Sequence, residues 1–115
     1  MPHKKLEVWK KSVDFVVEIY NITKKFPKEE LYGITLQMRK AAVSVPSNIA
    51  EGCSRKGKAE TIHFLYIATA SLAELETQLI IANKIEYISD IPSLLADLEE
   101  IKRMLIGFIK SLRQQ

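Results

Sequence analysis

The sequence predicts an all-α fold, an up-down antiparallel four-helix bundle built from a single domain over residues 1–115. Apolar residues recur at spacings of three and four along four long stretches, the pattern of helices with one buried face. Only four glycines and four prolines are present among 115 residues, too few for the frequent turns of an all-β domain. The segments between the stretches are short, so successive helices are expected to run antiparallel.

The first helix is expected over residues 6–26, and Pro27 should end it because proline cannot continue the hydrogen-bond ladder. Two apolar stripes run along it. The stripe expected to face the core contains Leu6, Trp9, Val13, Val16 and Tyr20, and the stripe beside it contains Val8, Phe15, Ile19, Ile22 and Phe26. A helix that is apolar on two sides needs a second burial partner, which indicates an oligomer.

The second helix is expected to begin near Lys28, where Glu29 and Glu30 suit the positive N-terminal end of a helix. Pro46 interrupts it, but the apolar pattern resumes directly afterwards, so we predict a continuous helix that is kinked at Pro46. The helix should end in the turn at residues 54–57, where Gly57 is expected to take a positive φ.

The third helix is expected over residues 59–86 and the fourth from about Pro92 to about Leu112. Ser89 and Asp90 offer an N-cap between them, with Pro92 early in the fourth helix. The longest stretch without a charged residue, 61–73, is too short for a membrane span. Cys53 is the single cysteine, which excludes a disulfide scaffold and suits a cytoplasmic protein.

No catalytic, metal or cofactor site is expected. Cys53 and His63 fall on different helices, and nothing in the sequence brings them together as a nucleophile and a base. A di-iron bundle needs two Glu-x-x-His pairs, and only Glu60 with His63 has that spacing. The four glycines are too dispersed for a phosphate-binding loop. The sequence therefore favours a protein that is not an enzyme.

Charge is distributed unevenly. The net charge is +3, with +6 over residues 1–58, −7 over residues 59–100 and +4 over residues 101–115. A segregated pattern can form a basic face that binds a polyanion, or it can serve salt bridges between helices.

Several motifs in order resemble one family of bacterial proteins. They are L-E-V-W at residues 6–9, F-P-K-E-E-L-Y-G at 26–33, Q-M-R-K-A-A-V-S-V-P-S-N-I-A-E-G-C-S-R at 37–55, and A-S-L-A-E-L-E-T-Q-L at 70–79. The chain resembles the four-helix-bundle proteins encoded by intervening sequences of bacterial 23S ribosomal RNA genes. The accessory variability determinant of diversity-generating retroelements belongs to the same fold group. The resemblance implies a ring-like homopentamer with a basic surface, and the retroelement relative binds nucleic acid and a reverse transcriptase.

Polar residues within these motifs predict a structural cluster. Its members are Arg39, Asn48, Glu51, Arg55 and Glu74. Glu51 and Arg55 have the favourable i,i+4 spacing of an ion pair, and Arg39 is expected to meet Glu74 across the bundle. The cluster either fixes the register of the helices or the subunit contacts, or it forms a ligand or phosphate site.

An antiparallel bundle brings the start of the first helix and the turn after the second helix to the same end. That end would carry the expected nucleic-acid-binding residues Lys4, Lys5, Lys10, Lys11, Arg55, Lys56 and Lys58. We therefore expect non-specific binding of structured RNA or an RNA–DNA hybrid. The alternative hypothesis is a protein-interaction scaffold, which docks a partner such as a reverse transcriptase without binding nucleic acid directly.

Overall fold

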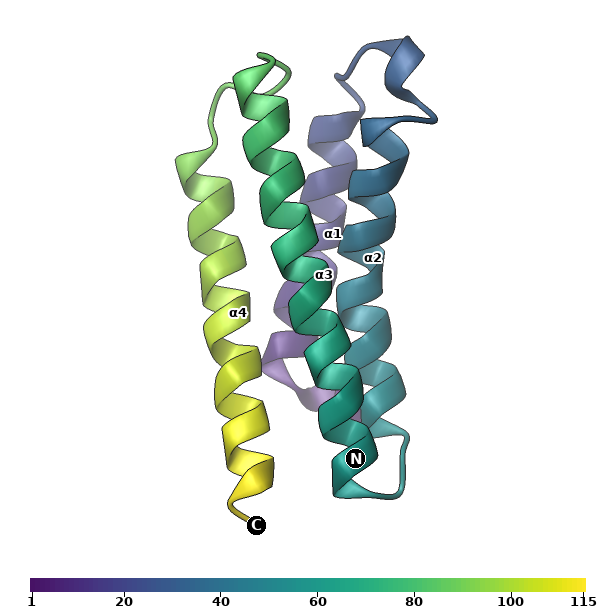
Figure 1. Cartoon of the computed structure of the whole chain (residues 1–115), viewed down its shortest axis with the longest axis vertical. Coiled ribbons are helices and arrows are strands. Elements are labelled where there is room, and N and C mark those ends of the chain that lie inside the picture. Colours follow the sequence, from purple (N-terminus) through teal and green to yellow (C-terminus); the bar gives the residue numbers. More distant parts are fainter.

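The computed structural model describes residues 1–115 and contains four long α-helices and no strand. They are α1 (Glu7–Thr23), α2 (Ile34–Cys53), α3 (Lys58–Lys84) and α4 (Pro92–Arg113), and the 3-10 turns η1 (His3–Lys5) and η2 (Lys28–Glu30) precede α1 and α2. Successive helices run antiparallel in an elongated bundle of 46 × 24 × 20 Å (Figure 1). The predicted all-α four-helix bundle is confirmed.

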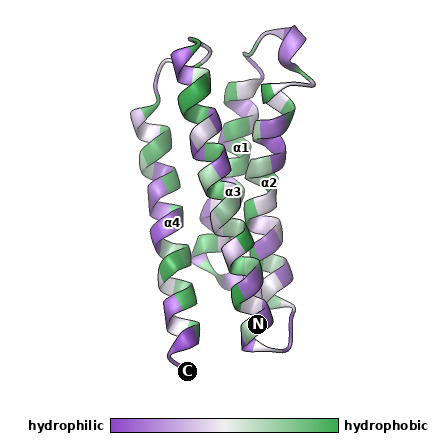
Figure 2. Ribbon diagram, viewed as in Figure 1, coloured by the Kyte–Doolittle hydropathy of each residue, from purple (hydrophilic) through white to green (hydrophobic).

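The core lies between the four helices, and apolar and polar residues interleave along each ribbon (Figure 2). The helices α2 and α3 share the most extensive interface, whereas α1 and α4 share the smallest interface between neighbouring helices. The largest completely buried side chains come from all four helices and include Ile19, Met38, Leu65, Leu75 and Leu105. Burying each of them contributes about 1.5–3 kcal/mol from the hydrophobic effect.

The close approach of α2 and α3 depends on Gly52. A Cβ atom at this position would lie 3.0 Å from the Cβ of Phe64 and 3.1 Å from the carbonyl oxygen of Thr61. The Thr61 hydroxyl donates a hydrogen bond of 2.8 Å to the carbonyl oxygen of Gly52. Two turns earlier in α2, the hydroxyls of Ser44 and Ser71 are hydrogen-bonded at 2.8 Å. Small and hydroxyl-bearing residues therefore bring these two helices together.

Pro46 lies inside α2, as predicted, and the helix continues through it to Cys53. The proline ring is buried and replaces a main-chain donor, so the helix loses one internal hydrogen bond at this point. Ile49 and Cys53 follow on the same buried face. The packing of this face against the other helices offsets the local cost of the proline.

The ends of the first two helices differ from the prediction. The helix α1 stops at Thr23, three residues before Phe26, because Pro27 disfavours helical geometry in the residue before it. Lys28 does not begin α2. It opens the short turn η2, and the non-helical backbone of Gly33 (φ −105°, ψ −122°) delays the start of α2 to Ile34.

Turn chemistry also differs from the prediction at three positions. Gly57 has a φ of −100° and not a positive value. The positive φ, 67°, belongs to Glu86, where the amide of Tyr87 bonds the carbonyl of Ala82 in a helix-ending motif that glycine usually occupies. Ser89 and Asp90 do not cap α4, whose N-cap is Ile91. Pro92 is the first residue of α4, as expected.

The stripe of α1 that enters the core is not the one predicted. Val8, Phe15 and Ile19 are buried, and Ser12 and Thr23 complete the same line. Tyr20 is 38% exposed, and Trp9 is only partly buried. The other stripe lies at the margin of the core: Leu6, Trp9 and Val16 are partly buried and pack against it. At its far end, the exposed Tyr20 lies beside Arg39 of α2.

By length and composition alone, α3 is apolar enough to cross a membrane. Its leucines at positions 65, 72, 75 and 79 are completely or almost completely buried within the bundle. Only 33% of the most apolar stretch of α3 is buried, however, and Tyr66, Ile80 and Ile81 are exposed, so burial within one chain explains only part of its composition.

The Gly52 contact gives a stability prediction. Gly52→Ala should lower the free energy of unfolding by about 1–3 kcal/mol, because the new methyl group meets the backbone of α3. Gly107→Ala is the matched control, since a Cβ atom added to Gly107 of α4 would have no other atom within 4 Å. That control should gain about 1 kcal/mol from helix propensity. Urea unfolding monitored by circular dichroism measures both, and equal changes would contradict the proposed close approach.

Candidate nucleic-acid interface

Three segments of the chain meet at one end of the bundle, where Figure 1 also places both termini. The Met1 amino group donates a hydrogen bond of 3.0 Å to the carbonyl oxygen of Cys53, at the end of α2. The Lys58 ammonium donates one of 2.7 Å to the carbonyl oxygen of Gln115. We call residues 1–10, 51–60 and 110–115 the basic end. Its formation confirms that the start of α1 lies beside the α2–α3 turn.

The two ends of the bundle differ in charge. The basic end carries eight lysines and arginines against three glutamates: Lys4, Lys5, Lys10, Arg55, Lys56, Lys58, Lys110 and Arg113, with Glu7, Glu51 and Glu60. The opposite end, residues 20–33 and 80–93, carries four lysines and four carboxylates: Lys24, Lys25, Lys28 and Lys84, with Glu29, Glu30, Glu86 and Asp90. Positive charge therefore accumulates at one end only.

Within the basic end, the cations fall into two groups. Arg55 pairs with Glu51 at 3.2 Å and lies 4.0 Å from Glu60, and its guanidinium stacks 4.8 Å from the Phe64 ring. Lys10 pairs with Glu7 at 3.4 Å. Lys4, Lys5, Lys56 and Lys110 are exposed and make no ion pair within 4.0 Å. These four lysines are the ones most free to meet a phosphate.

Lys11 does not lie with the basic end. Its ammonium pairs with Glu100 of α4 at 2.9 Å, in the groove between α1 and α4. This hydrogen bond, together with the charge of Glu100, raises the pKa of Lys11 and lowers the pKa of Glu100. Lys11 therefore links two helices rather than extending the basic end.

The end of α4 adds residues that the sequence analysis did not select. Arg113 stacks over Tyr66 of α3, with its Cζ 5.3 Å from the ring centroid. These two residues line an open groove with Lys110, Ile106 and Ile109, and none of the five is acidic. The positive charge of residues 101–115 could have indicated these residues. In an up-down bundle, the end of the fourth helix lies beside the start of the first helix.

The predicted polar cluster does not form as one unit. Arg39 does not pair with Glu74; its Nε donates to the Thr23 hydroxyl at 2.9 Å, and its guanidinium stacks 4.6 Å from the Tyr20 ring. Glu74 lies instead beside Ser71 along the α2–α3 surface. The Asn48 amide donates to the carbonyl oxygen and the hydroxyl of Ser44, at 2.8 and 2.9 Å.

The remaining pair of this cluster, Glu51 and Arg55, forms as predicted at 3.2 Å, but at the exposed surface. The spacing of these residues along α2 predicts the local pair correctly. Contacts between helices depend on side-chain direction, which spacing does not supply.

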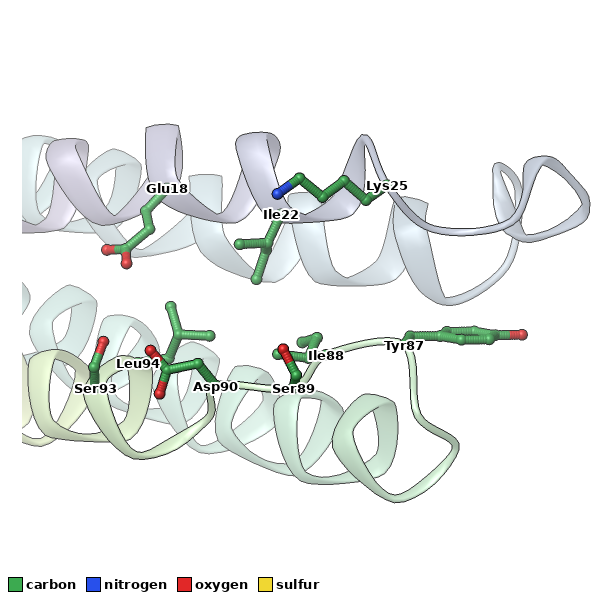
Figure 3. Close-up of a pocket in the computed structure, with 9 residues that line it drawn as sticks. All are labelled: Glu18, Ile22, Lys25, Tyr87, Ile88, Ser89, Asp90, Ser93 and Leu94. Atoms are coloured by element: carbon green, nitrogen blue, oxygen red, sulfur yellow. The ribbon is translucent and has the colours of Figure 1, made fainter.

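A second groove runs between α1 and α4. It encloses about 240 Å³ near the α3–α4 loop and is lined by Glu18, Ile22, Lys25, Tyr87, Ile88, Ser89, Asp90, Ser93 and Leu94 (Figure 3). Glu18 and Asp90 point into it from opposite sides. Burial and the neighbouring Asp97 carboxylate raise the pKa of Glu18. The groove contains no histidine or cysteine.

Cys53 and His63 occupy different environments. Burial raises the pKa of the Cys53 thiol, which opposes formation of a reactive thiolate. His63 is exposed on α3, with its ring against the edge of Phe64. No group of three or more His, Cys, Asp or Glu side chains is placed to hold a metal ion.

The comparisons with known proteins agree with this architecture. A family model described as 23S rRNA-intervening sequence protein matches residues 4–107. The chain belongs to this family. One solved structure, a protein of unknown function from the S23 ribosomal protein family of Bacteroides thetaiotaomicron VPI-5482, is 30% identical. The match covers 90% of this chain and 98% of that chain, with a TM-score of 0.83. No curated protein matches the chain.

Membership of the 23S rRNA-intervening sequence protein family accounts for the four-helix fold and for the motifs in residues 6–79. The relation to the retroelement accessory determinant stays a prediction. The family description names a genomic origin and not an activity, so the function has to be argued from the basic end itself.

The α1–α4 groove gives a pH prediction. The pKa of Glu18 in the folded state lies above its ordinary value of 4.5, so the ionised carboxylate opposes folding at neutral pH. That cost disappears as the pH falls through the folded-state pKa. Glu18→Gln should therefore raise the melting temperature at pH 7 and have little effect near about pH 3.5.

The matched control is Glu100→Gln, in an adjoining pocket between α1 and α4 that Glu18 also lines. Because Lys11 lowers the pKa of Glu100, the ionised form favours folding, and this variant should lower or leave unchanged the melting temperature at pH 7. Thermal unfolding over a pH series measures both variants. A melting temperature that falls in Glu18→Gln at pH 7 would contradict this account of the groove.

Proposed function

We propose that this protein is a non-enzymatic, cytoplasmic, oligomeric scaffold that binds structured RNA or an RNA–DNA hybrid non-specifically through its basic end. The observation that carries the proposal is the difference between the two ends of the bundle: eight basic side chains against three acidic ones at one end, and equal numbers at the other. Phosphate contacts from lysine and arginine supply most of non-specific nucleic-acid affinity. Such contacts need no cavity and no reading of base edges.

Main-chain amides at the basic end offer local contacts to an anion. The helices α1 and α3 both begin there, and neither N-cap residue supplies a side-chain hydrogen bond. Their first-turn amides can therefore donate to a phosphate, whereas α2 and α4 end at the same place and their dipoles oppose those of α1 and α3. Lys56 lies just before the start of α3, and Lys4 and Lys5 lie just before the start of α1.

An apolar face on α1 and α2 supports the oligomeric part of the proposal. Arg39 of α2 stacks on Tyr20, so the surface stripe of α1 lies beside α2. Val17 of α1 is 56% exposed, and Leu36 and Val43 of α2 are each 40% exposed. Exposed apolar residues that gather on one face are typical of subunit interfaces. We call the surface formed by Val13, Val16, Val17, Tyr20, Leu36 and Val43 the α1–α2 apolar face.

Assembly would strengthen RNA binding without new contacts. In a ring-like homopentamer, as the resemblance implies, five basic ends would lie on the same side of the ring. Several weak phosphate contacts then act together, because the first one raises the effective concentration of the others.

The oligomer is tested by Val17→Glu combined with Val43→Glu. These substitutions place carboxylates on the α1–α2 apolar face, where a partner subunit would desolvate them. We expect the wild-type protein to show about five times the 13.1 kDa chain mass in multi-angle light scattering, and the double variant to show the mass of one chain. Ile106→Glu, at a 50% exposed residue of α4, is the control and should keep the assembly. A monomeric wild-type protein contradicts the prediction.

RNA binding is tested by reversing three of the unpaired lysines of the basic end, in the variant Lys4→Glu, Lys5→Glu and Lys56→Glu. Fluorescence anisotropy with a labelled structured RNA and nuclease-treated protein is measured over a salt series. We expect the affinity to fall at least about tenfold, and the slope of log K against log salt to become shallower by about two to three units, roughly one for each lost phosphate contact.

The control is Lys25→Glu, Lys40→Glu and Lys84→Glu, which changes the net charge equally outside the basic end. It should keep most of the affinity and the wild-type salt slope. Equal losses of affinity in both variants would show that RNA binding depends on the net charge of the protein and not on the lysines of the basic end. If the wild-type protein fails to bind RNA at low salt, the protein-interaction scaffold replaces this proposal.

A further inference from the structure

A cavity of about 400 Å³ lies at the opposite end from the basic end, between the end of α1, the α1–α2 loop and the first turns of α2. It is lined by Thr23, Lys24, Phe26, Pro27, Lys28, Leu31, Thr35 and Arg39. Three of these residues are cations and none is a carboxylate. The α1–α4 groove differs, because Glu18 and Asp90 accompany its single lysine.

The carboxylates of the neighbouring loop do not neutralise these cations. Glu30 accepts a hydrogen bond of 2.9 Å from the Tyr87 hydroxyl and is thereby directed toward the α3–α4 loop. Lys24, Lys28 and Arg39 take part in none of the ion pairs of the structure within 4.0 Å. The positive charge of the cavity is therefore uncompensated by the protein.

Arg39 is held in a fixed position with donors to spare. Its Nε donates to the Thr23 hydroxyl, which in turn donates to the carbonyl oxygen of Ile19 at 2.7 Å. The stacking on Tyr20 fixes the plane of the guanidinium. The two Nη groups make no hydrogen bond within the protein. A guanidinium held in this way presents a pair of donors that matches phosphate or carboxylate oxygens.

Thr35 adds a second and independent observation. It is only 3% exposed, it lines the cavity, and its hydroxyl has no hydrogen-bond partner. Buried hydroxyls in folded proteins are normally paired. Thr35 is also in the first turn of α2, whose N-cap Gly33 supplies no side-chain hydrogen bond. The positive end of the α2 dipole therefore lies next to this unpaired hydroxyl.

We propose that this cavity binds the phosphate of a phosphate monoester such as a nucleoside monophosphate, with Arg39, Lys24, Lys28 and the Thr35 hydroxyl as its ligands. Thr35 lies in the first turn of α2, so the start of this helix borders the same cavity and its positive dipole end favours an anion there. Phe26, Pro27 and Leu31 form the apolar part of the lining, against which the organic part of the ligand packs. This site is separate from the basic end and does not depend on RNA binding there.

Isothermal titration calorimetry of the wild-type protein with AMP, inorganic phosphate and adenosine tests the proposal. AMP and phosphate should bind, and adenosine should not, because only the phosphate meets the cations. Arg39→Gln should weaken AMP binding at least about tenfold, as expected for charge-assisted hydrogen bonds. Arg103 is an exposed residue of α4 outside the cavity, so Arg103→Gln should leave AMP binding unchanged. Absence of AMP binding, equal binding of adenosine, or equal losses in both variants overturns the proposal.

A second variant keeps the test informative if Arg39→Gln fails to fold. Thr35→Val replaces the unpaired hydroxyl with a methyl group of similar size. It should raise the melting temperature of the free protein, because no buried polar group is left unpaired, and weaken AMP binding. Unchanged AMP affinity in this variant overturns the placement of the phosphate at the start of α2.

A short RNA with either a 5′-phosphate or a 5′-hydroxyl identifies the source of the phosphate monoester. If the protein prefers the RNA with a 5′-phosphate and Arg39→Gln removes that preference, the cavity binds the RNA terminus. Binding of AMP with no preference between the two RNAs assigns it to a free nucleotide. Each result supports a phosphate site. The charge-reversal variant of the basic end should weaken both RNAs equally and should leave the AMP affinity and the preference between the two RNAs unchanged.

Discussion

The close contact between α2 and α3 is the constraint on which the rest of the bundle depends. Gly52 lets the backbones approach, and the hydroxyls of Thr61 and Ser71 are hydrogen-bonded across the same interface. Because α2 and α3 are joined by a short turn, their contact fixes the position of residues 54–57 relative to both helices. The helices α1 and α4 then pack beside this pair, and their mutual interface is the smallest between neighbouring helices. The polar groove between α1 and α4 follows from that weaker contact.

Much of the fold could be predicted because the helices are long and strongly periodic. The continuation of α2 through Pro46 was correctly predicted from the apolar residues that follow it. The helix ends were less accurate, since they depend on single residues such as Gly33 and Glu86 whose backbone angles composition does not determine. The choice between the two stripes of α1 was wrong for a related reason. Both stripes are apolar, and only the position of α2 decides which one reaches the core.

The topology of the bundle predicts which segments meet at the candidate site, but it does not predict which side chains pair with each other. Antiparallel helices bring Lys4 and Lys56 to one end, whatever their side chains contact. The pairing of Lys11 with Glu100, by contrast, requires the register of α4 against α1. The expected Arg39–Glu74 pair failed in the same way, because Thr23 and Tyr20 from α1 hold the guanidinium instead. Patterns within one helix therefore transfer to the structure more reliably than patterns between helices.

The unequal charge of the two ends gives each subunit an electric dipole along the 46 Å axis of the bundle. Subunits arranged side by side around a ring would all point the same way, so their basic ends would repel one another. Dissolved ions screen that repulsion and would tighten the ring. The same ions compete with the protein for the phosphates of RNA and would weaken binding. Ionic strength would therefore act in opposite directions on assembly and on RNA binding, and bound RNA would itself serve as the counterion that holds the ring together.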